Sequence, residues 1–87
     1  MDKNKIVAIF NSYLRQNAVN INEVTELCSE YLEDINAPNK EENMKLLVNN
    51  PTLITNMFPD VIRHFSVKHT ICSIIFNNKI LMYYVSD

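Results

Sequence analysis

Four side chains, Cys28, His64, His69 and Cys72, are of the types that bind zinc. Structural zinc sites use cysteine and histidine, usually with two ligands held together by a short spacing such as Cys-x-x-Cys. The chain has no such pair, and both cysteines stand among apolar residues, which is typical of buried thiols. We therefore expect no metal and no cofactor. Two lone cysteines without an export signal are usually reduced, so a disulfide between them is the less favoured alternative.

The residue types present would allow two catalytic arrangements, a nucleophilic cysteine or a pair of carboxylates. Cys28 lies near Glu30 on an acidic helix, and negative surroundings raise the pKa of a thiol instead of activating it. The acidic residues of that helix are spread along its surface, which is typical of a solvated face. The chain contains no glycine, so a glycine-rich phosphate loop is excluded. We expect no catalytic residues and no enzymatic activity.

Half of the ten acidic residues lie between residues 23 and 34. Glu26, Glu30 and Glu33 are close enough along a helix to repel one another by a few tenths of a kcal/mol per pair. A helix with a purely structural role has little reason to keep such repulsion. The first hypothesis is therefore that these three glutamates bind a basic surface of a partner protein.

Basic residues gather later in the chain, at Arg63, His64 and Lys68, with Lys79 further on. They fall where helices are followed directly by a predicted β-hairpin, which is the element order at the end of a winged-helix domain. Under this alternative, residues 59–69 form the recognition helix and Lys79 lies in the wing of a DNA-binding regulator. The net charge of −2 and the apolar strands argue against it. A basic fringe on a packed helix is the other interpretation.

Helical periodicity covers most of residues 4–69. Apolar residues recur at spacings of three and four over residues 4–16 and again after Asn20. Asn20 and Glu23 form a capping-box pattern, and Val19 can pack on Val24, so a second helix is predicted to begin there. Residues on these apolar stripes should form the core, and those expected to be most buried are Phe10, Leu27, Tyr31, Val61, Phe65 and Ile74.

Further helices are predicted from asparagine and proline. Asn39 and Glu42 repeat the capping pattern before a short helix that ends near residues 49–50. Pro51 and Pro59 each suit the first turn of a helix, because proline supplies the right φ angle and its missing N–H is not needed there. Two short helices are therefore expected, at residues 51–57 and 59–68.

Residues 70–85 read as two strands joined at Asn77-Asn78, a pair that tolerates the positive φ angles of a tight turn. Both faces of this hairpin are apolar, and an isolated hairpin is marginally stable in water. The helices of so short a chain can cover only one face well. We therefore predict a homo-oligomer, a dimer, assembled through the hairpin. The interface residues proposed are Ile71, Met82, Tyr83, Tyr84 and Val85.

One short resemblance involves residues 13–27. Tyr13-Leu14, Asn17, Val19, Ile21, Glu23-Val24 and Leu27 resemble the N-terminal helical stretch of the Ros/MucR bacterial transcriptional regulators. It covers about a quarter of the chain, and the zinc-finger part that reads DNA in that family has no counterpart here. No function is transferred from it.

The composition, 47% hydrophobic and 21% charged over 87 residues, is that of one small globular domain, residues 1–87. The expected fold is α+β, mostly α, with four or five short helices followed by a C-terminal two-stranded antiparallel hairpin. The longest early apolar run, residues 6–10, is too short for a signal peptide or a membrane span, so a soluble, cytoplasmic protein is expected. Thirteen asparagines hint at an AT-rich viral, phage or low-GC bacterial genome. The function expected is a small interaction or regulatory module, such as a host-modulating factor.

Overall fold

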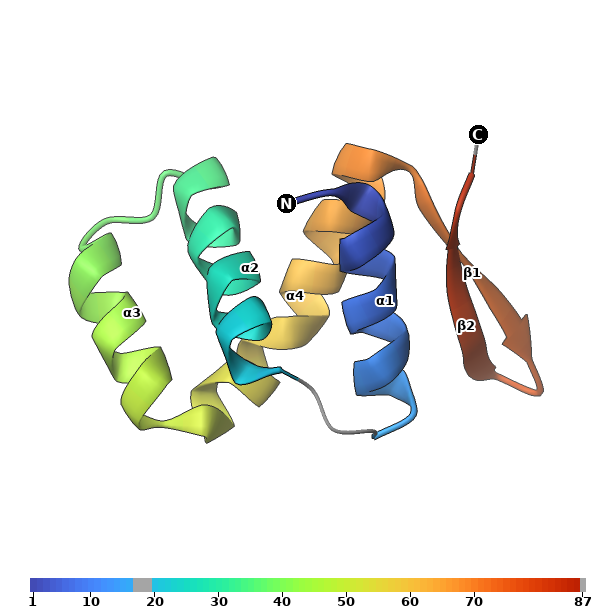
Figure 1. The fold of residues 1–87 in the computed structure, drawn as a ribbon, viewed down its shortest axis with the longest axis horizontal. Helices are drawn as coiled ribbons and strands as arrows, with labels where there is room; N and C mark the ends of the chain where they lie inside the picture. Colours follow the sequence, from blue (N-terminus) through green and yellow to red (C-terminus); the bar gives the residue numbers. More distant parts are fainter. Residues whose placement is uncertain (17–19, 87) are drawn as a thin grey trace.

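The structure, a computed structural model, describes residues 1–16 and 20–86. Within these ranges the chain forms four helices followed by an antiparallel hairpin, which confirms the expected mostly α fold with a small β part (Figure 1). The elements are α1 (Lys3–Leu14), α2 (Ile21–Asp34), α3 (Lys40–Asn49), α4 (Pro51–His69), β1 (Ile71–Phe76) and β2 (Lys79–Val85).

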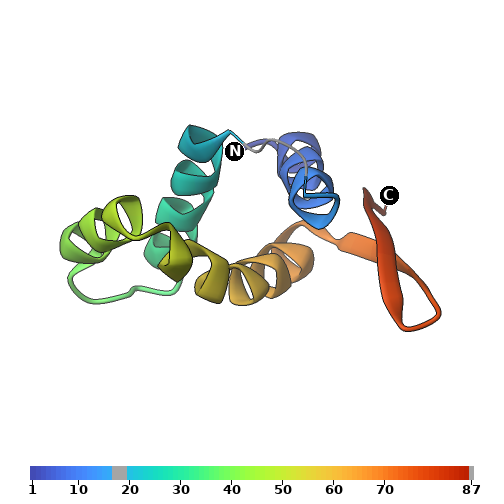
Figure 2. The ribbon, with the colours of Figure 1, turned by 90° about the horizontal axis from the view of Figure 1, so that it is seen from below.

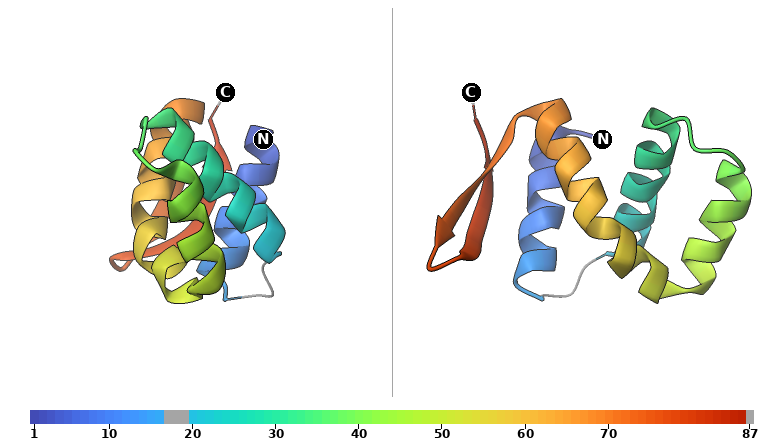
Figure 3. Two further views of the ribbon diagram at one scale, coloured as in Figure 1. Left: turned by 90° about the vertical axis from the view of Figure 1, so that its left-hand side faces the viewer. Right: turned by 180° about the vertical axis from the view of Figure 1, so that it is seen from behind.

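The elements are arranged along one axis, giving a molecule of 38 × 25 × 21 Å. α3 lies at one end, α2 and α1 follow, and the hairpin lies at the other end beside α1 (Figure 1). α4 crosses one side of both α1 and α2 and so joins the two ends (Figures 2 and 3). The hairpin is thus covered by helices from one direction only. Among the described residues, no helix is both long and apolar enough to cross a membrane.

Two helices, α2 and α3, begin directly after the asparagines that were predicted to precede them. Asn20 caps α2, where its side-chain oxygen accepts hydrogen bonds from the backbone N–H groups of Asn22 and Glu23, at 2.9 and 3.4 Å. Asn39 precedes α3 as predicted, but it adopts a left-handed φ of 54° and makes no side-chain cap. The predicted capping box there is wrong. The proposed packing of Val19 on Val24 lies outside the described residues.

Pro59 lies inside α4, so the prediction of two separate helices at residues 51–57 and 59–68 is wrong. A proline inside a helix removes one hydrogen bond, here to the carbonyl of Thr55, four residues earlier. Thr55 is exposed, so water can bind that carbonyl. The opposite side of the helix stays buried on both sides of the proline, which holds the helix together; its buried residues are Ile54, Phe58, Val61 and Phe65.

The core is one cluster to which all six elements contribute. Phe10, Leu27, Val61 and Phe65 are fully buried, which confirms four of the predicted core residues. Tyr31 is half-buried. Ile74 is 44% exposed, so its prediction as a core residue is wrong: it lies on the strand face that no helix covers.

Asparagine takes the place of glycine at several positive-φ positions, as the glycine-free sequence requires. Asn77 and Asn78 have φ angles of 52° and 63° and form the hairpin turn at the predicted place. Asn36 follows α2 with a φ angle of 54°. Thr70, a β-branched residue for which this region is strained, has the same φ angle at the end of α4.

Candidate functional site

Asn11 of α1 joins the helices to the hairpin. Its side-chain Oδ1 accepts a hydrogen bond from the backbone N–H of Tyr83 at 2.7 Å, and its Nδ2 donates to the Tyr83 carbonyl at 3.0 Å. An amide side chain offers the same donor and acceptor as a backbone peptide. Asn11 therefore occupies the outer edge of β2 at Tyr83 much as a neighbouring strand would.

The side chain of Tyr83 anchors the same face of the hairpin. It lies edge-on to Phe10, with ring centroids 5.4 Å apart, and its burial raises the pKa of its hydroxyl. Tyr83 and Ile71 are 7% and 6% exposed. These two proposed interface residues are therefore part of the core of the chain, a correction to that set. Met82 and Val85 are half-buried, and Tyr84 remains exposed.

The rest of the hairpin presents a large apolar surface. We call the hairpin patch the six large apolar residues of the two strands that are exposed to solvent: Ile74, Ile75, Phe76, Ile80, Leu81 and Tyr84. Ile75 and Phe76 are 63% and 64% exposed. Of these six, the sequence-based interface had named Tyr84 alone, although the apolar character of both hairpin faces was a signal for the others. The six lie on both faces of the hairpin, since Ile74 and Ile75 alternate along β1. Exposed apolar surface of this extent is typical of interaction sites.

The two strands of the hairpin differ in regularity. Ile74 pairs with Met82 and Ile75 with Ile80, so Leu81 is an extra residue in β2 and forms a bulge. β1 has no extra residue, and no other strand in the described part of the chain pairs with its outer edge. β1 is therefore a regular edge strand, whereas β2 is bulged and is bound by Asn11.

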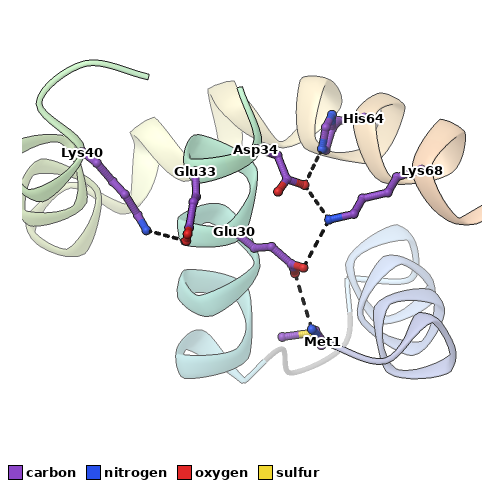
Figure 4. Close-up of polar contacts among 7 residues, drawn as sticks. All are labelled: Met1, Glu30, Glu33, Asp34, Lys40, His64 and Lys68. Atoms are coloured by element: carbon purple, nitrogen blue, oxygen red, sulfur yellow. Dashed lines mark hydrogen bonds and ion pairs between the residues drawn. The ribbon is translucent and has the colours of Figure 1, made fainter. Parts of the chain in front are cut away.

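Two of the three glutamates proposed to bind a partner already have partners within the chain (Figure 4). Glu30 lies 3.5 Å from the Lys68 Nζ and 3.6 Å from the amino group of Met1, and Glu33 lies 3.1 Å from the Lys40 Nζ. Glu26 is exposed. The repulsion that motivated a basic partner is thus reduced by contacts inside the molecule.

The basic residues of α4 are also engaged in ion pairs. Asp34 accepts hydrogen bonds from Lys68 at 2.7 Å and contacts the His64 Nε2 at 2.8 Å (Figure 4). The hydrogen bond from Lys68 lowers the pKa of Asp34 most, and the hydrogen bond from His64 lowers it further. The hydrogen bond to Asp34 in turn raises the pKa of Lys68. Arg63 pairs with Asp60 at 3.4 Å.

These contacts bear on the DNA-binding alternative. A recognition helix needs exposed basic side chains directed at the groove and phosphates. Here His64 and Lys68 are turned toward α2, and the neighbouring Phe58, Val61 and Phe65 of α4 are buried in the core. The hairpin turn that follows β1 points away from the end of α4 (Figure 1). Among the described residues, these contacts therefore give little support to one exposed basic face formed by α4 and Lys79.

The four cysteine and histidine residues with metal-binding side chains, all of which the structure describes, do not form one cluster. Cys28 is buried in the core, where burial raises its pKa to about 11. The ring of His69 is parallel to that of Phe65, with the two ring centroids 6.0 Å apart. Within the described ranges, no group of three or more His, Cys, Asp and Glu side chains is placed to hold a metal ion. Cys28 and Cys72, both described, are free thiols.

A shallow groove of about 550 Å³ lies beside the ion pairs between α2 and α4. It is lined by Tyr31, Ile35, Asp60, Arg63, His64, Val67 and Lys68. Arg63 pairs with Asp60 within this lining, Lys68 pairs with Asp34 and Glu30, and the His64 Nε2 lies 2.8 Å from Asp34. The groove is widely open. It offers no arrangement of an activated nucleophile and base. The hairpin patch is the candidate functional site.

Comparison with known proteins gives no match: neither a protein-family model, nor a curated protein, nor a solved structure is significantly similar to the chain.

Proposed function

We propose that the chain is a non-enzymatic protein-interaction module and that the hairpin patch is its binding surface. The observation that supports this most is the exposure of six large apolar side chains on one projecting element. Lys79 is the one charged residue between positions 70 and 85. Exposed strands are normally protected by charges, prolines or covering segments, so an exposed hairpin with a single charge at its turn is typical of a surface that a partner covers.

The attachment of the hairpin to α1 also supports a binding role. Its base is anchored to α1 by Asn11 and by the buried rings of Tyr83 and Phe10. A surface held on a rigid support loses less conformational entropy when a partner binds. Any regulatory or host-modulating action of the chain would be exerted through the binding of a protein to this surface.

A site-specific photocrosslinking experiment tests the proposal. The photoreactive residue p-benzoylphenylalanine replaces Phe76 in one sample and Val48, an exposed apolar residue of α3, in a matched control; the two positions are 64% and 60% exposed. In native cell extract and in the purified protein, we expect a discrete crosslinked product from position 76 and none from position 48. Excess unlabelled parent protein should suppress the product, whereas excess Phe76→Lys protein should not.

Two results would contradict the proposal. One is the absence of a discrete product from position 76 in both samples. The other is an equal yield of the same products from position 48, since that would show that exposure alone determines the crosslink.

A further inference from the structure

We propose that the partner at the hairpin is a second copy of this chain, which pairs antiparallel with the outer edge of β1 to form a four-stranded sheet across a two-fold axis. This inference rests on the proposed function, because it names the occupant of the same surface.

The direction of the backbone groups identifies β1 as the edge that is open. Tyr83 and Ser73 are opposite one another in the hairpin. The N–H and the carbonyl of Tyr83 are both bound to Asn11, so these two residues form a non-hydrogen-bonded pair of the antiparallel ladder. The N–H and carbonyl of Ser73 consequently face away from β2. They point to the outer edge of β1, where a further strand would bind them.

β1 also lacks the features that prevent strand addition. It contains no charged residue and no proline, and the bulge of the hairpin lies in β2. A regular strand of six residues can pair along its whole length, whereas a bulge interrupts the ladder.

Self-pairing is favoured over a different protein strand by charge and symmetry. Two uncharged β1 strands bring no like charges together, and no opposite charge on a partner is needed for recognition. A two-fold axis lets one edge satisfy itself and leaves no open edge on either β1. At each outer side of the new sheet, the edge of β2 is already bound by Asn11 of α1.

Two-fold pairing also accounts for a residue that the single chain leaves uncovered on the side of the sheet that faces α1. Ile75 and Ile80 pair with each other and, by strand alternation, Ile75 shares a face with Ile71. Ile71 is buried, but Ile75 and Ile80 are 63% and 37% exposed. In an antiparallel arrangement the helical end of one copy lies beside the turn end of the other. The end of α4 in the second copy, which leads into its β1, is thus placed near Ile75, whereas Ile80 lies one strand further away on β2.

Pairing of two β1 edges leaves much of the hairpin patch uncovered, because Ile74 and Ile75 lie on opposite faces of the strand. The interface is therefore smaller than the roughly 800 Å² per partner of a standard one. A dimer that dissociates on dilution is expected, rather than an obligate one.

The test is the mass in solution, measured by light scattering over a dilution series of the full chain. Ser73→Pro removes the outward N–H without touching the ladder to β2, and Ile75→Lys places a charge at the edge. Val48→Lys is the matched control. We expect the parent and the control to have twice the 10.2 kDa of one chain at high concentration, and both hairpin variants to have the mass of one chain with an unchanged helical circular dichroism signal.

Hydrogen exchange of the parent supplies a second readout that does not depend on the variants folding. The Ser73 amide should exchange more slowly as the concentration rises, while that of Val48 should not change. A parent with the mass of one chain at every concentration, variants that keep the dimer mass, or a Ser73 exchange rate independent of concentration would each overturn the inference. If the parent is monomeric but position 76 still crosslinks to another protein, the proposed function stands and the second copy is excluded.

Discussion

Asn11 and Tyr83 are 72 residues apart in the sequence and are joined by two hydrogen bonds of 2.7 and 3.0 Å. Both bonds use the backbone of Tyr83, so they place the strand regardless of its side chain. Together with the buried ring of Tyr83, they determine which part of the hairpin faces α1 and which part is left exposed.

Asn11→Ala tests this connection. The substitution removes both bonds and leaves two partly buried backbone groups of Tyr83 without partners, which should lower the free energy of unfolding by about 1–3 kcal/mol. Asn22→Ala, at an exposed position of α2, is the control and should change it by less than about 0.5 kcal/mol. Urea denaturation gives both values. Equal stabilities of the two variants would show that Asn11 does not anchor the hairpin.

Thr70 is a site where a substitution should stabilise the fold. It holds a φ angle of 54° at the junction of α4 and β1, and a β-branched residue in this region is strained. Thr70→Asn should raise the free energy of unfolding by about 1 kcal/mol, because asparagine tolerates this conformation better. Thr52→Asn, in the first turn of α4, should give no gain. A destabilised Thr70→Asn protein would contradict the conformation assigned to this residue.

Asp34 should make stability depend on pH in a defined direction. Its pKa in the folded chain is lowered from the ordinary 3.8 by Lys68 and then by His64. The unfolded chain therefore binds a proton more readily, so the contribution of Asp34 is present above pH 3.8 and is lost as the pH falls through the lower folded-state pKa.

The parent should accordingly exceed Asp34→Asn in stability at neutral pH, by no more than about 1 kcal/mol because the pair is partly exposed. The difference should disappear in acid. The Lys68 pKa is raised above 10.5, so its share is present below that pH and is lost as the pH rises through the higher folded-state pKa. Asp60→Asn is the control for a surface pair. A stability difference that persists unchanged in acid would exclude the pairing.

The two thiols should differ in reactivity. The pKa of Cys28 is raised to about 11 by burial, so only about one thiol in a thousand is ionised at pH 8. In Cys72→Ser, labelling of Cys28 by a disulfide reagent should be slow and should become fast when urea unfolds the chain. In Cys28→Ser, labelling of the half-buried Cys72 is the comparison. Rapid labelling of Cys28 in the folded protein would show that α2 is not packed as described.

Local signals in the sequence predicted several elements correctly. Asn20 begins α2, Asn77-Asn78 forms the turn, and the apolar stripes placed Phe10 and Leu27 in the core. Each depends on neighbouring residues or on a regular period. Pro59 was misread because a proline suits both the start of a helix and an interior position whose freed carbonyl faces water.

Contacts between distant residues could not be predicted in this way. Nothing near Asn11 indicates that its amide binds β2, and the contacts of Asp34 with His64 and Lys68 depend on how α2 and α4 cross. The exposure of Ile74 could not be predicted either. Its type and spacing match those of a core residue, and only the position of α1 shows which face of the strand is covered.

Hydroxyl-radical footprinting of the hairpin patch tests the central claim most directly, because it reports whether these side chains are covered in the working protein. Oxidation of Phe76, Leu81 and Tyr84 is compared between a dilute sample and a concentrated sample supplemented with native cell extract, with Val67, 81% exposed on α4, as the internal reference. We predict a several-fold loss of oxidation at the three hairpin residues and none at Val67. Oxidation of the patch that stays at the level of the dilute sample would contradict the claim that the hairpin is a protein-binding surface.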